Sequence, residues 1–258
     1  MTYEGLVDTL RAAGCVFAED EARLLMKSDG SLAEKTAKRV AGVPLEQVLG
    51  WAEFAGLRVA VRPGVFVPRR RTELLVRLAV AALADCGLVP DGLVPGGLVL
   101  DLCCGTGAVG RAVAARVPGV ELHAADLDPV AVACARDNLA GVGVVHGGDL
   151  FDAVPGSLRG RIDVLTVNAP YVPSGAVPLM PPEARDHEAW LALDGGPDGL
   201  DVHRRVAAEV AAWLAPGGVV VIETSTAQAD RTAALLPLTT QIVHHDALDG
   251  TAVVGRAA

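Results

Sequence analysis

The tetrapeptide Asn168-Ala169-Pro170-Tyr171 follows an apolar run at residues 163–167 that has the composition of a buried strand. A planar amide or amino nitrogen is a poor nucleophile because its lone pair is delocalised. If the Asn168 side-chain oxygen and the Ala169 carbonyl bind its two hydrogens, the lone pair faces an electrophile, and positioning does most of the catalysis. Pro170 stiffens the loop, and Tyr171 can pack against a flat acceptor. These four residues are the predicted catalytic residues of methyl transfer from a sulfonium donor. A strand-terminating Asn-x-Pro turn is the alternative.

A glycine turn, Cys103-Cys104-Gly105-Thr106-Gly107, follows a second apolar run at residues 98–100. Its glycines allow the backbone to approach a ligand closely, and the following helix offers unpaired N–H groups. Asp101 precedes the first glycine by four positions. A carboxylate there suits a cationic sulfonium or amine ligand better than the pyrophosphate of a dinucleotide.

Two further acids are predicted at strand ends. Asp126, followed by Leu127, lies about twenty residues beyond the glycines, where an acid accepts hydrogen bonds from ribose hydroxyls. Asp149 and Leu150 end a third strand, where an acid and an apolar residue can flank an adenine. Asp128, which precedes a proline, is interpreted as a helix cap.

Apolar runs of strand length alternate with helical segments in the second part of the chain, and they occur at residues 98–100, 121–125, 144–146, 163–167 and 219–223. Residues 214–218 are interpreted as the turn before the last run. Near-continuous apolar strands separated by helices predict a mostly parallel sheet with helices on both faces. Ligands bind such doubly wound α/β folds at the carboxyl ends of the strands, where all the residues above are expected to meet.

The first part of the chain predicts a smaller unit. Residues 1–50 have the spacing of short amphipathic helices, with a capping-box pattern at Ser31-Leu32-Ala33-Glu34. Alternation at residues 57–61, a turn at 62–64 and a strand at 65–67 predict a β-hairpin. Residues 72–83 have helical spacing, and the Pro/Gly-rich stretch 89–97 predicts a loop. The predicted domains are a helical domain (1–50), a hairpin linker (51–70) and an α/β domain (71–258).

Composition narrows the function classes. The 258 residues carry a formal charge of −9, which disfavours a polyphosphate partner. No apolar run reaches ~18 residues without a charge, Pro or Gly, and the first residues lack a signal-peptide pattern, so a cytoplasmic protein outside the membrane is expected. The five cysteines form no C-x-x-C pair, and no zinc or other metal site is predicted.

With these motifs the sequence resembles the protein-(glutamine-N5) methyltransferases, which modify a glutamine of peptide chain release factors or of a ribosomal protein. The similarity extends from about residue 44 to the last strand and includes the glycine turn, the tetrapeptide, Val67-Pro68-Arg69, Thr72-Glu73, and residues 44–50 and 192–200. The resemblance implies a seven-stranded Rossmann-like class I methyltransferase fold and S-adenosylmethionine as cofactor. It also implies a protein substrate, such as a release factor, that the helical domain and hairpin help to present. The cofactor-binding residues expected from the motifs and the resemblance are Asp101, Cys103, Cys104, Gly105, Thr106, Gly107, Asp126, Leu127, Asp149, Leu150 and Asn168.

Departures from the family pattern indicate a divergent paralogue, and the amino-terminal domain is expected to be shorter than in typical members. Ala169 replaces the first of two prolines in the tetrapeptide, but its carbonyl remains, so activity is expected to be retained. Arg70 and Arg71 replace a proline and an acid, which reverses the charge beside the expected substrate channel. Cys103-Cys104 replaces a small, Gly-rich lead-in.

Other interpretations stay open. An adenine- or guanine-N-methyltransferase of nucleic acids would use the same tetrapeptide chemistry, but the acidic balance and a single run of three arginines weigh against it. A small-molecule N-methyltransferase and an inactive cofactor-binding module are further alternatives, and a nicotinamide dehydrogenase fits least. Arg185, Asp186 and Glu188 could close over the pocket, but a solvated surface loop is the preferred interpretation. Glu223 at the end of a strand is interpreted as a helix cap as readily as a functional acid.

Overall fold

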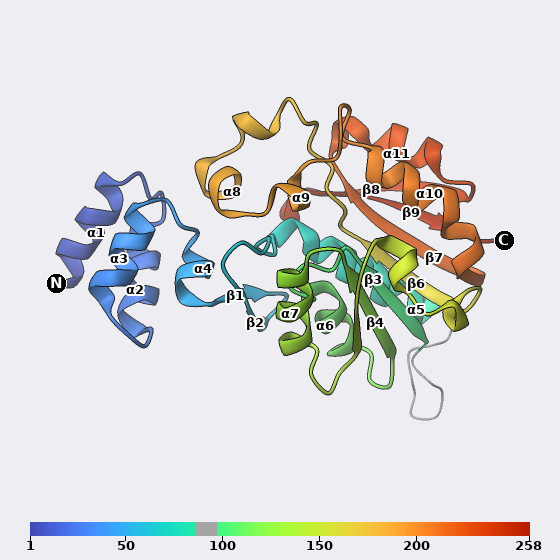
Figure 1. Ribbon diagram of the computed structural model, residues 1–258, viewed down its shortest axis with the longest axis horizontal. Helices are drawn as coiled ribbons and strands as arrows, with labels where there is room; N and C mark the ends of the chain where they lie inside the picture. The colour runs from blue at the N-terminus through green and yellow to red at the C-terminus, as the bar shows by residue number, and fades with distance from the viewer. Residues whose placement is uncertain (86–96) are drawn as a thin grey trace.

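The computed structural model describes residues 1–85 and 97–258, so the loop predicted at residues 89–97 lies outside the described residues except for Gly97. Figure 1 shows a group of N-terminal helices joined through α4 and a two-stranded hairpin to a larger α/β body. No helix among the described residues is long and apolar enough to cross a membrane.

Within the described residues one seven-stranded sheet forms the centre of this body, in the order β5-β4-β3-β6-β7-β9-β8. From β5 to β7 all neighbours are parallel, whereas β9 runs antiparallel to β7 and β8. The strands are β3 (Leu98–Leu102), β4 (Glu121–Asp126), β5 (Val144–Gly147), β6 (Ile162–Val167), β7 (Leu214–Thr224), β8 (Thr239–His245) and β9 (Gly250–Arg256). The predicted, mostly parallel sheet is confirmed.

Helices cover both faces of this sheet. They are α5 (Glu73–Asp85), α6 (Ala108–Ala114), α7 (Pro129–Asn138), α10 (Asp201–Trp213) and α11 (Ala229–Leu235). All five residues of β3 are buried, and their side chains alternate between the faces. Val99 packs with α5, α6 and α7, whereas Leu100 and Leu102 pack with α10. Burial on both faces explains why the strand is a continuous apolar run, and it confirms the doubly wound, Rossmann-like fold.

The N-terminal fifty residues form helices, as predicted. They are α1 (Tyr3–Ala12), α2 (Ala18–Lys27), α3 (Leu32–Val40) and α4 (Leu45–Leu49). Leu6 and Leu10 are buried in a separate small core between these helices. The Ser31 hydroxyl accepts a hydrogen bond from the Glu34 N–H (3.3 Å) at the start of α3, which confirms the cap.

The hairpin lies earlier in the chain than predicted. Its strands are β1 (Trp51–Phe54) and β2 (Leu57–Ala60), and its turn is Ala55-Gly56, where both residues have positive φ (52° and 79°). Residues 65–67, predicted as its second strand, do not pair with 57–61. The Val67 N–H instead donates to Glu188 Oε1 (3.1 Å), and Gly64 forms an isolated bridge with Glu188.

Two features of the C-terminal part also differ from the sequence prediction. Strand β7 begins at Leu214, but its pairing with β6 is irregular between Leu214 and Val219, so the turn predicted at residues 214–218 is a bulge within the strand and does not precede it. The antiparallel strands β8 and β9 were not located from the sequence. Shorter helices α8 (Pro182–His187) and α9 (Trp190–Leu193) occupy the loop after β6. Short 3-10 segments are Arg70–Thr72, Leu150–Ala153, Gly156–Leu158, Val177–Leu179, Thr226–Gln228 and Asp246–Leu248.

Candidate active site

The sheet topology brings the two predicted motifs together. After β5 the chain returns across the sheet, and β6 pairs directly with β3, with Leu102 opposite Val167. The glycine turn at the end of β3 and the tetrapeptide at the end of β6 therefore lie side by side. This is the topological switch point, where doubly wound sheets bind their ligands.

The glycine turn has a left-handed backbone at Cys103, Gly105 and Gly107, with φ of 57°, 54° and 74°. Space is open at Gly105, where an added Cβ would have no heavy atom within 4 Å. At Gly107 an added Cβ would lie 3.1 Å from Leu139 of the segment after α7. Gly105 is thus the glycine that allows a ligand to approach, whereas Gly107 allows close packing at the start of α6.

Asp126 at the end of β4 holds the glycine turn in place. Its Oδ2 accepts from the Gly105 N–H (2.8 Å) and its Oδ1 from the Asp128 N–H (2.9 Å). Burial raises the pKa of Asp126, and the hydrogen bond from Gly105 opposes this rise. Asp128 caps α7 through the Val130 N–H (2.8 Å), with Pro129 at the first helical position, as predicted.

Asp101 is buried beneath the turn, and internal groups bind both of its carboxylate oxygens. Oδ2 accepts from the Gly110 N–H of α6 (3.0 Å), and Oδ1 accepts from the Thr166 hydroxyl of β6 (2.9 Å). Burial raises its pKa to about 7, although both hydrogen bonds lower it. Asp101 therefore links β3, β6 and the helix that follows the turn.

The end of β5 supplies Asp149 and Leu150. Asp149 Oδ2 accepts from Arg205 Nη2 of α10 (2.8 Å), so this acid is paired with an arginine that also lines the cavity. Leu150 has a φ of 46° and is buried in the core beside α10. The backbone there turns sharply into a 3-10 segment.

In the tetrapeptide, the Asn168 side chain has no hydrogen-bond partner among the described residues, whereas the Tyr171 hydroxyl is hydrogen-bonded. No group in residues 1–85 or 97–258 hydrogen-bonds the side-chain amide of Asn168, and none binds the carbonyl of the buried Ala169. The Tyr171 hydroxyl donates to Glu223 Oε1 of β7 (3.0 Å), and burial is the main cause that raises the pKa of this phenol. The loop is therefore fixed at Tyr171, while the Asn168 amide remains available to a ligand.

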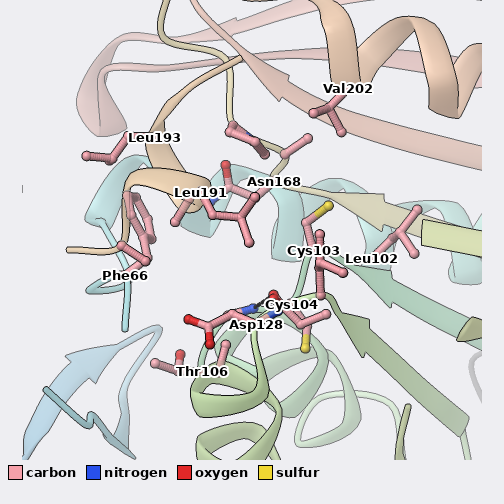
Figure 2. Close-up of a pocket in the computed structure, with 18 of the residues that line it drawn as sticks. Phe66, Leu102, Cys103, Cys104, Thr106, Asp128, Asn168, Leu191, Leu193 and Val202 are labelled. Atoms are coloured by element: carbon pink, nitrogen blue, oxygen red, sulfur yellow. Dashed lines mark hydrogen bonds between the residues drawn. The ribbon is translucent and has the colours of Figure 1, made fainter. Parts of the chain in front are cut away.

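One cavity joins these groups. Figure 2 shows Asn168 on the same side of it as Leu191 and Leu193, with Thr106 and Asp128 on the opposite side. All predicted site residues except Gly107 line it, namely Asp101, Cys103, Cys104, Gly105, Thr106, Asp126, Leu127, Asp149, Leu150, Asn168, Ala169, Pro170 and Tyr171. Lining residues that the sequence analysis did not assign to the site include Phe66, Arg71, Thr72, Leu191, Leu193 and Val202.

Two buried carboxylates correct the sequence interpretation. Glu188, expected on a solvated loop, is 6% exposed and binds Arg69 Nη2 (2.5 Å) as well as the Val67 N–H. Glu223, considered as a helix cap, is 2% exposed and binds Tyr171 and Arg71 Nε (3.2 Å) instead. Only their partners, far away in the sequence, reveal these roles.

Among the described residues, no group of three or more His, Cys, Asp or Glu side chains is arranged to hold a metal ion. The thiols of Cys103 and Cys104 both have raised pKa values, mainly because of burial, so they are neutral at physiological pH.

Comparisons with known proteins agree with this geometry. Residues 57–179 match the family model described as "Methyltransferase small domain". The chain is 39% identical over 201 residues to a release factor glutamine methyltransferase of Streptomyces coelicolor, covering 78% of this chain and 69% of the relative. It is 36% identical over 208 residues to a 4-amino-L-phenylalanine/4-methylamino-L-phenylalanine methyltransferase of Streptomyces pristinaespiralis, covering 80% of this chain and 70% of the relative.

A solved structure shows the same fold. A methyltransferase from Pyrococcus furiosus superposes with a TM-score of 0.52 at 14% identity and covers 87% of this chain and 98% of its own. The chain is a methyltransferase and belongs to the release factor glutamine methyltransferase family.

Proposed function

We propose that this enzyme transfers the methyl group of S-adenosylmethionine to the side-chain amide nitrogen of a glutamine in a protein substrate of the peptide chain release factor type. The observation that carries the proposal is the Asn168 amide, which lines the cavity beside the glycine turn and has no hydrogen-bond partner in residues 1–85 or 97–258. The names of the relatives, of which several are release factor glutamine methyltransferases, support this acceptor class.

The residues around the glycine turn fit the proposed cofactor. S-adenosylmethionine, when bound, supplies an electrophilic methyl group on a sulfonium sulfur. The open space at Gly105 admits a ligand against the backbone, and Asp126 and Asp149 offer carboxylates to its hydroxyl or amino groups. Leu127 and Leu150 provide apolar surface to either side of a flat base.

Asn168 and Ala169 orient the acceptor. Their two oxygens accept the two N–H groups of the glutamine amide, which turns the nitrogen lone pair toward the methyl group. The new N–C bond forms as the sulfur–carbon bond breaks, and the nitrogen then loses one proton to solvent. No strong base has to act before the transfer, because the hydrogen bonds supply the orientation that the reaction requires.

The test is transfer of labelled methyl from S-adenosylmethionine to a size-fractionated lysate, with nuclease- and protease-treated controls. We expect label in a protein band that resolves to methylglutamine. Asn168→Ala should lose about a hundredfold or more in turnover while keeping its thermal midpoint and its cofactor affinity within a few-fold. Label that disappears on nuclease treatment, or undiminished transfer by Asn168→Ala, would contradict the proposal.

A second candidate is N-methylation of a small amino-acid acceptor. It is favoured by Arg71, a cation in the cavity lining, together with the relative named as a 4-amino-L-phenylalanine/4-methylamino-L-phenylalanine methyltransferase. Label in a small-molecule fraction that resists protease would identify this function.

A further inference from the structure

The cavity wall at residues 66–72 contains a cation that the proposed methyl transfer does not use. Arg71 lines the same cavity as Asn168 and Tyr171, and its side chain is 44% exposed. Its Nε donates to Glu223 Oε1 (3.2 Å). No carboxylate in the described ranges bonds its terminal nitrogens, so the outer edge of the guanidinium is available for a planar, two-oxygen partner.

We propose that Arg71 binds a carboxylate of the methyl acceptor and thereby selects acceptors that carry an anionic group close to the target nitrogen. The proposal rests on the function proposed above and deepens it by naming a chemical feature of the acceptor. The carboxylate is either the free α-carboxylate of an amino acid or the side chain of an acidic residue beside the target.

The neighbouring arginines make Arg71 the one suited to this role. Arg69 is occupied, because its guanidinium binds the buried Glu188 and lies over the Phe66 ring, 5.2 Å from the centroid. Arg70 is exposed and does not line the cavity. Arg205, which also lines the cavity, is paired with Asp149. Arg71 is therefore the cavity cation beside Tyr171 and the acceptor loop.

The surroundings strengthen such a contact. Phe66, Leu191 and Leu193 line the cavity with apolar surface, and charge-assisted hydrogen bonds gain strength where water is excluded. Glu223 is 2% exposed, and its Oε1 already binds Tyr171 and the Nε edge of Arg71. Because Glu223 holds the Nε edge, the guanidinium is oriented before an acceptor binds. Such pre-organisation lowers the entropy lost on binding.

If Arg71 served only as the counter-ion of Glu223, the effect of replacing it would not depend on the charge of the acceptor. Such a replacement would impair neutral and anionic acceptors equally. A carboxylate-binding Arg71 predicts that the preference between the two acceptors changes. The ratio of specificities therefore separates the two roles, whatever the overall loss of activity.

The experiment uses two matched acceptor pairs with the full-length enzyme. N-acetylglutamine is compared with N-acetylglutamine amide, which differ only in the free α-carboxylate. Capped Ala-Gln-Glu is compared with capped Ala-Gln-Ala, which differ in an acidic neighbour. For each pair kcat/KM is measured by transfer of labelled methyl, and Kd is measured by calorimetry with the enzyme saturated with S-adenosylhomocysteine, so that binding is read out without turnover.

In the wild-type enzyme at least one pair should favour the carboxylate-bearing member by about tenfold or more. In Arg71→Gln the ratio should fall to about one, and in Arg71→Glu below one, whereas the matched control Arg70→Gln should keep the wild-type ratio. The pair that shows the preference identifies the source of the carboxylate. Equal values within both wild-type pairs, no binding of any of the four acceptors, or an Arg71→Gln ratio equal to wild type would overturn the proposal. Failure of the proposed function would show separately, as the loss of Asn168-dependent transfer to protein.

Discussion

Cys103 in the glycine turn has a φ of 57°, in the left-handed region. A residue with a Cβ adopts this region at a cost of about 1–2 kcal/mol, which glycine does not incur. Cys103→Ala removes the sulfur and keeps the Cβ, whereas Cys103→Gly removes both. The difference between these two variants therefore isolates the Cβ. Glycine also gains freedom in the unfolded chain, which offsets about 0.4–1 kcal/mol. We expect Cys103→Gly to be more stable than Cys103→Ala by about 0.5–1 kcal/mol.

The adjacent Cys104 provides a matched control. It is buried in the same turn but is not among the residues with positive φ. There the order should reverse, with Cys104→Ala more stable than Cys104→Gly by about 0.5–1 kcal/mol, because glycine has only its entropic cost. The assay is urea unfolding of the four variants without cofactor, comparing midpoints at equal m-values. In thermal unfolding the same differences correspond to shifts of about 1–4 °C. If Cys103→Ala equals or exceeds Cys103→Gly while the control pair behaves as stated, the turn is not strained by a Cβ and the reasoning fails.

Two further predictions concern buried charges. The pKa of Asp101 is raised to about 7 by burial, so the stabilisation from its protonated form is complete below the unfolded value near 4 and is lost as pH rises through about 7. The matched variant is Asp101→Asn, whose amide can still accept from Gly110 and can donate to Thr166. Between pH 4 and 7.5 the free energy of unfolding of the wild type should fall by up to about 4 kcal/mol relative to that of this variant. Equal pH dependence of the two unfolding free energies would refute this. Arg39→Ala leaves the buried Glu21 without its partner (2.6 Å) and should cost about 3–5 kcal/mol in urea unfolding; a loss below about 1 kcal/mol would show that the pair contributes little.

The parallel part of the fold was predictable because its signals are local. Strand β3 is buried on both faces and therefore forms an uninterrupted apolar run, and the glycine turn follows directly. Each predicted acid stands at the end of its own strand, so alternation of strands and helices was enough to place Asp101, Asp126 and Asp149 at one edge of the sheet. The tetrapeptide at the end of β6 obeys the same rule.

The features that escaped prediction depend on distant partners or on weak turn signals. The hairpin turns at Ala55-Gly56, where an alanine in the left-handed region gives no sequence signal, whereas Pro63-Gly64 is a stronger signal for a turn that joins no hairpin. Strand β8 has no fully buried residue and lacks a continuous apolar run, so its composition does not mark it as a strand. Glu188 contacts Val67, 121 positions earlier, and no local pattern indicates such a pairing.

The two sides of the cavity therefore differ in origin: one is formed by local sequence and the other by contacts between distant segments. The side at which we propose that the cofactor binds consists of strand ends and a glycine turn, each fixed by its own local sequence and held by bonds such as that from Gly105 to Asp126. The side at which we propose that the acceptor binds consists of segments brought together by long-range pairs, Arg69 with Glu188 and Arg71 with Glu223. Substitutions in these pairs change the charge presented to the acceptor without touching the glycine turn. In the site proposed above, acceptor specificity can thus diverge while the glycine turn is retained. Relatives of similar identity, 39% and 36%, carry names that give a release factor and 4-amino-L-phenylalanine as acceptors.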